Sequence, residues 1–429
     1  MHLPRLLAIA SLAAVSVQPI LAATHDLPTA SAESEGMSAE RLARLNSGMK
    51  QLVDEGKLAG AVTMVSRHGK VVEFDAVGKR DIAANAPMQK DSIFRIYSMS
   101  KPITGVAMMI LFEEGKWQLN DPVAKYIPEF AKLKVYGTDA NNNVVMKDPN
   151  HPVTMRELMS HSGGFTYGFF SNTPVDKLQL EADVLNPNNT LDEFIKRVAK
   201  LPLNAQPGSE WHYSISVDIQ GYIVQKLSGM PFEEFLEKRV FKPLGMVDTA
   251  FYVPKEKLNR FAEFYSYDKD GKMQVVGPHD GLNHDFSAKP ALSSGGGGLV
   301  STASDYMRFC QMVLNGGQLD GVRILSPLTV ELMRTNVLPP NMTVFGQVAG
   351  FGLDFAVYTD PVAAGGYYGK GSFYWGGAAG TWFWIDPVND LVVLGMIQQV
   401  AGTGAAAAGG GLPDVRGLSH AWTYQAIVK

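Results

Sequence analysis

A serine and a lysine three residues apart, Ser98 and Lys101, open an apolar run in the segment FRIYSMSKPITGVAMM, residues 94–109. In the first turn of a helix, free backbone N–H groups and the helix dipole favour negative charge developing on Ser98. Residues three apart share one helical face, so the amine of Lys101 can point at the serine oxygen. A buried amine loses its proton readily and can then activate a serine nucleophile.

The same pair of residue types also fits an ordinary helix start, with a capping serine and a surface lysine. A second copy of the pattern, Ser47 and Lys50, lies inside a predicted helix among polar and acidic neighbours. The Ser-x-x-Lys pattern alone therefore does not establish a catalytic site.

Tyr213 stands just before a predicted helix that ends at Gly229. A phenol with a pKa of about 10 is a poor base in water, but a neighbouring ammonium favours its anion. It could then carry the proton of Ser98 to a leaving group. A core tyrosine with a satisfied hydroxyl is the alternative. We interpret Asp218, in the first turn of the same helix, as a capping and orienting residue rather than a base.

Two glycines, Gly376 and Gly377, follow three aromatic residues in KGSFYWGGAAGTWFWIDP, residues 370–387. Glycines weaken a strand, but they suit a place where a substrate lies close against the backbone. The N–H groups of Ala378 and Ser98 would then form a donor pair for a tetrahedral oxyanion. A bulge or bend at the two glycines is the alternative.

Other catalytic patterns are missing from the sequence. There is no Gly-x-Ser-x-Gly elbow, no Gly-x-Gly-x-x-Gly opening a helix after a strand, and no Walker loop. The cluster His279, Asp280, His284 and Asp285 matches no common zinc spacing, so we predict no metal site and no cofactor. Cys310, the single cysteine, lies in an apolar helical run and is interpreted as a packed, inert thiol.

The elements that must position these residues follow from hydrophobic periodicity. A helical stripe with Ser38 at its start and Gly56 at its end precedes a predicted hairpin, and a second helix follows Ser98. Later strands are so closely spaced that only hairpins can join them, which predicts an antiparallel meander. The predicted helices are 38–55, 102–114, 154–160, 191–199, 218–227, 232–241 and 418–428, and the predicted strands are 61–67, 70–78, 351–359, 368–377, 380–386 and 391–400.

The composition suits a soluble globular protein with a sizeable core, with 46% hydrophobic and 19% charged residues among 429. The net charge of −4 and the lack of a basic stripe give no reason to expect a nucleic-acid partner. Arg5, a short apolar segment and small residues up to Ala23 predict a signal peptide, residues 1–23, and hence a periplasmic or secreted bacterial protein. The apolar segment is short for a span of about 20 residues, so no stable membrane span is expected after cleavage; an N-terminal anchor is the alternative.

Three short motifs in order carry a family resemblance. Ser98-Met99-Ser100-Lys101, Tyr213-Ser214-Ile215 and Trp375-Gly376-Gly377 resemble the serine β-lactamase-like family. The sequence is most similar to the family VIII bacterial carboxylesterases, which are related to class C β-lactamases and D-alanyl-D-alanine peptidases. The resemblance covers nearly the whole mature chain and includes GMSAERLARL (36–45), ELMSHSGGF (157–165) and SGGGGLVSTASDYMRF (294–309).

The resemblance implies an α+β fold of the β-lactamase/D,D-peptidase type. An antiparallel sheet flanked by helices would be built from residues 30–115 and 290–429, with a mainly helical domain, 116–289, inserted between them. The strand-poor middle of the chain agrees with that layout.

The resemblance also implies roles. Ser98 would be acylated, Lys101 and Tyr213 would manage its proton, and which of those two is the base stays open. The N–H groups of Ser98 and Ala378 would form the oxyanion hole. Trp375, with Gly376 and Gly377, would line the substrate site.

Two departures from the class C β-lactamases bear on the substrate. Those enzymes usually carry Asn where this chain has Ile215, and Lys-Thr-Gly where it has Trp375-Gly376-Gly377. Losing both polar groups favours neutral esters, so we predict a serine carboxylesterase for short-chain esters. The alternatives are a β-lactamase or D-alanyl-D-alanine peptidase, including promiscuous cephalosporin hydrolysis, and a non-hydrolysing β-lactam sensor.

Overall fold

The computed structural model describes residues 26–141, 143–277, 283–345, 349–366, 368–400 and 412–429. The expected signal peptide, residues 1–23, lies outside these ranges, as do His279 and Asp280 of the histidine-rich cluster. Within the described ranges, no helix combines the length and apolar character that a membrane crossing requires.

An eight-stranded antiparallel sheet joins segments from both ends of the chain. The early strand β1 pairs with the late strand β16, with Val65 opposite Val393. The strands, in the order in which they lie in the sheet, are β12 (Gly350–Phe351), β13 (Ala356–Val357), β14 (Phe373–Gly376), β15 (Trp382–Asp386), β16 (Leu391–Met396), β1 (Gly60–Arg67), β2 (Lys70–Asp81) and β3 (Ala86–Pro87). The predicted fold class and the predicted meander are confirmed.

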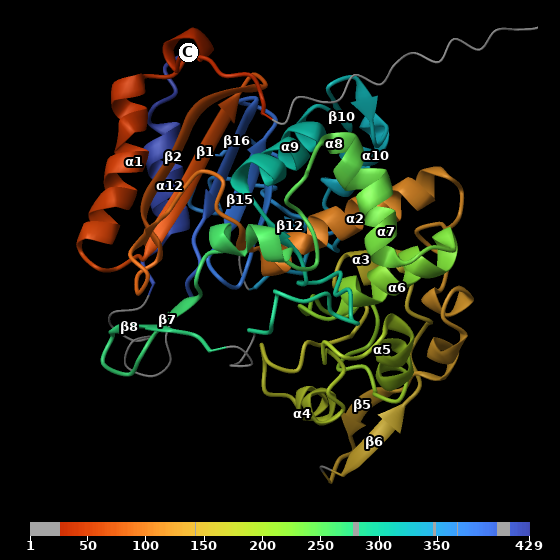
Figure 1. Ribbon diagram of the computed structural model, residues 1–429. Helices are drawn as coiled ribbons and strands as arrows, with labels where there is room; N and C mark the ends of the chain where they lie inside the picture. Colours follow the sequence, from red (N-terminus) through yellow and green to blue (C-terminus); the bar gives the residue numbers. More distant parts are fainter. Residues whose placement is uncertain (1–25, 142, 278–282, 346–348, 367, 401–411) are drawn as a thin grey trace, which may run out of the picture.

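Helices cover both faces of this sheet (Figure 1). Successive side chains of β16 point to opposite faces of the sheet, as they do along any strand. Leu391 and Val393 pack with α1 (Ala39–Asp54) and α12 (Val415–Tyr424). Val392 and Leu394 pack on the other side, with α2 (Ser100–Glu113) and α9 (Ala303–Leu314), where Cys310 is buried.

Some predicted strands are wrong in detail; for example, the strand expected over 368–377 forms only over Phe373–Gly376. Residues 351–359 were expected to be continuous, but the chain turns between β12 and β13. A side chain at Gly352 would overlap the carbonyl of Met333, and Asp354 has a left-handed backbone with φ of 64°. A left-handed residue interrupts a strand. The contact between Gly352 and Met333 joins distant segments, so local periodicity could not predict it.

In the order of the sequence, a mainly helical part separates the two sheet-forming segments. In space it lies beside the sheet (Figure 1). Capping boxes begin three of its helices, each with a threonine at the N-cap. Its helices are α3 (Met155–Met159), α4 (Pro174–Glu181), α5 (Leu191–Val198), α6 (Ser216–Ser228), α7 (Phe232–Leu236), a π-helical turn (Glu237–Phe241) and α8 (Lys242–Leu244). Further short elements are the hairpins β5 (Val135–Thr138) with β6 (Val144–Lys147), β7 (Tyr265–Tyr267) with β8 (Met273–Val275) and β10 (Gln318–Leu319) with β11 (Val322–Arg323), the pair β4 (Phe94–Arg95) with β9 (Val300–Ser301), and α10 (Pro327–Met333).

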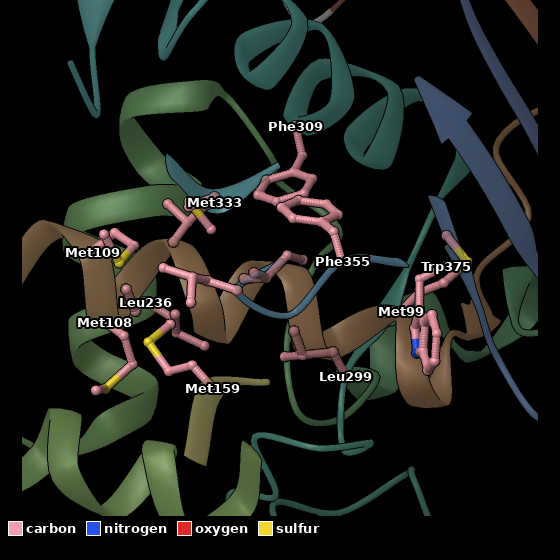
Figure 2. Close-up of a cluster of buried hydrophobic side chains, with 14 of the residues drawn as sticks. Met99, Met108, Met109, Met159, Leu236, Leu299, Phe309, Met333, Phe355 and Trp375 are labelled. Atoms are coloured by element: carbon pink, nitrogen blue, oxygen red, sulfur yellow. The ribbon is translucent and has the colours of Figure 1, made fainter. Parts of the chain in front are cut away.

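Helix α2, which follows Ser98, is buried all round from Ser100 to Leu111. The sequence pattern indicated one apolar side, but the helix lies between the sheet and the helical part, so every face meets protein. Figure 2 shows Met108 and Met109 among side chains from other elements, including Met333. A helix held on all sides is a rigid base for the residues at its N-terminus.

Candidate active site

Ser98 lies in a single 3₁₀ turn, Tyr97–Met99, directly before α2. The backbone of Tyr97 has a φ of 39°, a strained conformation for a residue with a side chain. The N–H of Ile96 donates to the carbonyl of Leu299 and helps to hold the turn. Tyr97 and Met99 are buried, whereas Ser98 is only half-buried, so the strained turn presents the serine hydroxyl to an open space.

The side chain of Lys101 is completely buried beside Ser98. Its Nζ lies 3.2 Å from Ser98 Oγ, 3.0 Å from the hydroxyl of Tyr167 and 2.6 Å from the carbonyl oxygen of Gly296. Burial lowers the pKa of Lys101 to about 7, although the charges of Asp218 and Asp354 oppose that shift. A neutral amine has two N–H donors and one lone pair. Gly296 and Tyr167 can accept the two donors, which leaves the lone pair for the Ser98 proton.

Tyr213 approaches the same serine from the segment that leads into α6. Its hydroxyl donates to Ser98 Oγ at 2.7 Å, and Lys101 Nζ lies 4.6 Å from the centroid of its ring. Burial raises the pKa of Tyr213, while the hydrogen bond with Ser98 opposes the shift. The phenol therefore keeps its proton near neutral pH and is suited to donate it. The amine and the phenol that the sequence singled out thus converge on one oxygen atom.

The two backbone N–H groups expected to bind an oxyanion belong to residues that line the same cavity. Within the described residues, neither the N–H of Ser98 nor that of Ala378 has a hydrogen-bond acceptor. Both residues line one cavity of about 530 Å³, which we call the Ser98 cavity. Unpaired donors facing a cavity are suited to a negative oxygen that forms during a reaction.

Gly376 and Gly377 have a packing reason that differs from the expected one. A side chain at Gly377 would overlap the carbonyl oxygen of Ile96, two residues before the nucleophile. A side chain at Gly376 would overlap the guanidinium of Arg416, on the face of β14 opposite Trp375, because successive side chains alternate. The glycines let the end of β14 lie against the segment that carries Ser98, and this approach brings Ala378 to the cavity.

Gly377→Ala is therefore expected to damage the site and the fold together. The added methyl group pushes β14 away from Ile96, which destabilises the protein by about 1–3 kcal/mol as overpacking does. It also displaces the N–H of Ala378, and losing one oxyanion donor lowers kcat by about 10²–10³-fold. Thermal unfolding and ester kinetics measure the two effects, and a variant with wild-type kcat would show that the position of Ala378 is unimportant.

Asp218 does not cap its own helix, contrary to expectation. Its Oδ1 accepts hydrogen bonds from Ser294 Oγ at 2.5 Å and from the N–H of Gly296 at 3.1 Å. Its Oδ2 accepts one from the hydroxyl of Tyr167 at 3.3 Å. Burial raises the pKa of Asp218, against the opposing effect of the Lys101 charge. Asp218 therefore ties α6 to the segment that carries Gly296.

Tyr167 is a site residue that sequence reasoning missed. Its hydroxyl connects Lys101 to Asp218, and burial raises its pKa well above the ordinary value. Tyr167 lies in a loop whose residues follow no helical or strand period, so hydrophobic periodicity did not indicate that it belongs to the site. The glycine run at 295–298 was an available signal of close backbone approach, since a side chain at Gly296 would lie 2.5 Å from both Tyr167 and Asp218.

Aromatic rings surround the Tyr213 phenol. The indole of Trp375, one of the expected substrate-site residues, lies 5.5 Å from the Tyr213 ring, between centroids. Trp211 stacks on it at 6.0 Å, and Phe170 and Phe345 contact the same ring at 5.2 and 5.8 Å. The buried imidazole of His161 also contacts this ring, at 5.0 Å, so the surroundings of the phenol are mainly aromatic.

Comparisons with known proteins bear on the family and the fold. The family model described as Beta-lactamase matches residues 45–412. Protein Rv1367c of Mycobacterium tuberculosis is 37% identical over 403 residues, which cover 89% of this chain and 98% of the relative. Esterase EstB of Burkholderia gladioli is 30% identical over 375 residues, or 83% of this chain and 90% of the relative. The solved structure of EstCE1, described as a hydrolase with promiscuous acyltransferase activity, has a TM-score of 0.75 at 26% identity and covers 90% of this chain and 99% of its own.

Proposed function

The chain belongs to the Beta-lactamase family, and from this premise we propose that it is a serine carboxylesterase that hydrolyses short-chain esters through an acyl-enzyme on Ser98. The similarity to Esterase EstB and to the hydrolase EstCE1 supports a hydrolase. The observation that carries the proposal is that Ser98 Oγ lies within hydrogen-bond distance of both Lys101 Nζ and the hydroxyl of Tyr213.

In the proposed reaction, neutral Lys101 accepts the proton of Ser98 while Oγ attacks the ester carbonyl. The N–H groups of Ser98 and Ala378 stabilise the oxyanion. As the intermediate collapses, the bond to the alcohol oxygen breaks and Tyr213 donates its proton to that oxygen. The Lys101 ammonium, 4.6 Å from the centroid of the Tyr213 ring, stabilises the phenolate that remains. Water then attacks the acyl-enzyme as its proton passes to the phenolate, and the Lys101 ammonium returns its proton to Ser98 Oγ as the carboxylic acid leaves.

Neutral esters fit the site better than substrates with a carboxylate. Ile215 and Trp375, which stand where class C β-lactamases usually carry polar groups, are both buried and apolar. The amine of Lys101 is already engaged with three partners inside the protein. The groups at the mouth of the Ser98 cavity include the exposed rings of Phe169 and Phe170.

The test is to compare turnover of p-nitrophenyl butyrate with that of a chromogenic cephalosporin. We expect the ester to have the higher kcat/KM, with esters of longer acyl chains declining. A higher kcat/KM for the cephalosporin would assign a β-lactamase instead. A stable adduct in mass spectrometry, formed without turnover of either compound, would assign a β-lactam sensor.

The pH dependence tests the identity of the base. Hydrolysis is expected to fall as the pH drops through about 7, the pKa of Lys101, because the ammonium cannot accept the Ser98 proton. Asp218→Asn removes a negative charge that raises this pKa, so the acid limb of kcat/KM should move to lower pH. Glu40→Gln, an exposed change in the first turn of α1, serves as the control and should leave the limb in place. A limb that Asp218→Asn moves upward would contradict Lys101 as the titrating group.

A further inference from the structure

Two cavities adjoin the reacting groups, and they meet at one side chain. The Ser98 cavity contains the nucleophile and Ala378. A second cavity of about 410 Å³, the Tyr213 cavity, is lined by Tyr213, Trp211 and Phe345. Phe170 contributes to the walls of both, so its ring lies where the two spaces meet.

The chemistry of ester cleavage gives these cavities different occupants. The acyl carbon bonds to Ser98 Oγ and its oxygen faces the N–H groups of Ser98 and Ala378, both of which line the first cavity. The leaving oxygen must receive a proton from a group within hydrogen-bond reach. In the proposed reaction that group is the hydroxyl of Tyr213, which lies 2.7 Å from Ser98 Oγ, and Tyr213 is also a wall residue of the second cavity.

We propose that the acyl half of the substrate occupies the Ser98 cavity, that the alcohol half occupies the Tyr213 cavity, and that the latter selects alcohols bearing an aromatic ring. This assignment rests on the proposed function and adds to it a substrate class, aromatic esters of short apolar acids.

The walls of the Tyr213 cavity favour a planar ring. Phe345 is 60% exposed, yet its ring lies 4.7 Å from that of Trp211 and 6.2 Å from that of Trp375. An exposed aromatic ring in contact with further rings offers a face for another ring, and such pairs add stabilisation beyond apolar burial. The carboxylate of Glu210 also lines this cavity and disfavours an anionic alcohol half.

The Ser98 cavity offers aliphatic contacts as well as aromatic ones. Beyond the reacting groups its lining includes the rings of Tyr97 and Phe169 and the side chains of Leu180 and Leu185. The two leucines can pack against an uncharged alkyl chain, which is the contact that a short acyl group needs.

A matched pair of variants separates the two halves. Phe345→Ala and Phe169→Ala each remove an exposed phenylalanine ring, 60% and 39% exposed, from one cavity only. Benzyl acetate and cyclohexylmethyl acetate share the acyl group and have alcohols of similar acidity, so their kcat/KM ratio reports aromatic recognition alone. The burst and steady phases with p-nitrophenyl acetate, butyrate and hexanoate give the deacylation rate, which depends on the acyl half alone.

We expect the wild-type protein to prefer the benzyl ester, and Phe345→Ala to reduce that preference by about three- to ten-fold, as the loss of an aromatic pair does. Deacylation of every acyl-enzyme should be unchanged in that variant. Phe169→Ala should show the opposite pattern, with an altered dependence of deacylation on acyl length and an unchanged benzyl preference. Thermal unfolding establishes that both variants fold.

The possible failures can be told apart. If Phe345→Ala alters deacylation while Phe169→Ala alters the benzyl preference, the two halves are reversed and the assignment is overturned while the esterase remains. If neither variant changes either quantity, the cavities do not hold the substrate. If the wild-type protein hydrolyses no ester faster than Ser98→Ala does, the proposed function itself fails, and the assignment with it.

Discussion

Ser98→Ala is expected to lower kcat/KM for ester hydrolysis by about 10⁴-fold or more, as removal of a nucleophile does in other serine hydrolases. Ser98 Oγ is the atom on which the Lys101 amine and the Tyr213 phenol converge, at 3.2 and 2.7 Å. Without it, neither proton carrier has an oxygen to activate. Hydrolysis of p-nitrophenyl butyrate measures the loss.

The fold should survive this substitution. Ser98 is half-buried and its side chain faces the cavity, so an alanine methyl group fits the same space. Thermal unfolding should give a midpoint close to that of the wild-type protein. Retention of the wild-type rate by Ser98→Ala would refute the assignment of the nucleophile.

Ser47→Ala is the matched control, since Ser47 begins the second Ser-x-x-Lys pattern. Ser47 is exposed on α1, its hydroxyl donates a hydrogen bond to the Arg44 carbonyl at 3.4 Å, and Lys50 pairs with Asp54 instead. A surface change of this kind alters stability by no more than about 0.5 kcal/mol. Activity should be unchanged, which would show that tertiary position and not the pattern makes a nucleophile.

Lys101→Met is expected to produce the second large loss, about 10²–10⁴-fold in kcat/KM, which is the usual contribution of a general base. Methionine is long enough to fill much of the buried space but has no lone pair that accepts a proton near pH 7. The acid limb near pH 7 should vanish in the residual activity, because the group that titrates there is gone.

The Lys101→Met variant also tests whether Lys101 or Tyr213 is the base, which the sequence left open. If the phenol of Tyr213 were the base, Lys101→Met would still leave a group that titrates, and the limb would move rather than disappear. Burial raises the pKa of Tyr213 and lowers that of Lys101, so the structure favours the amine as proton acceptor and the phenol as donor. A loss smaller than about ten-fold would contradict Lys101 as the base, given the usual size of that contribution.

Much of the site could be predicted from residue types in short segments. Ser98 with Lys101 is a local pair, because both lie within one turn, and helix geometry alone brings their side chains together. Tyr213 and Ala378 were named from local context and a family resemblance. Their meeting with Ser98 depends on contacts between distant segments, such as β14 against the 3₁₀ turn.

Residues that lie in loops could not be found in the same way. Tyr167, Trp211 and Phe345 follow no period of 2 or 3.6, so nothing in the pattern distinguishes them from core aromatics. Gly376 and Gly377 were recognised as unusual, but the packing that requires glycine there was not predicted. The space beside them is filled by Arg416 and by the backbone of Ile96, which only the folded chain shows.

The amino-acid sequence by itself determined which groups are available for chemistry and which helices and strands carry them, because propensity, capping and side-chain period act over a few residues. Only the tertiary structure decided that Lys101 is buried with a pKa of about 7 and that Asp218 bonds to Ser294 and Gly296. It also decided that two cavities meet at Phe170. Burial and cavity shape arise from segments far apart in the chain that exclude water together, and no local pattern records which segments those will be.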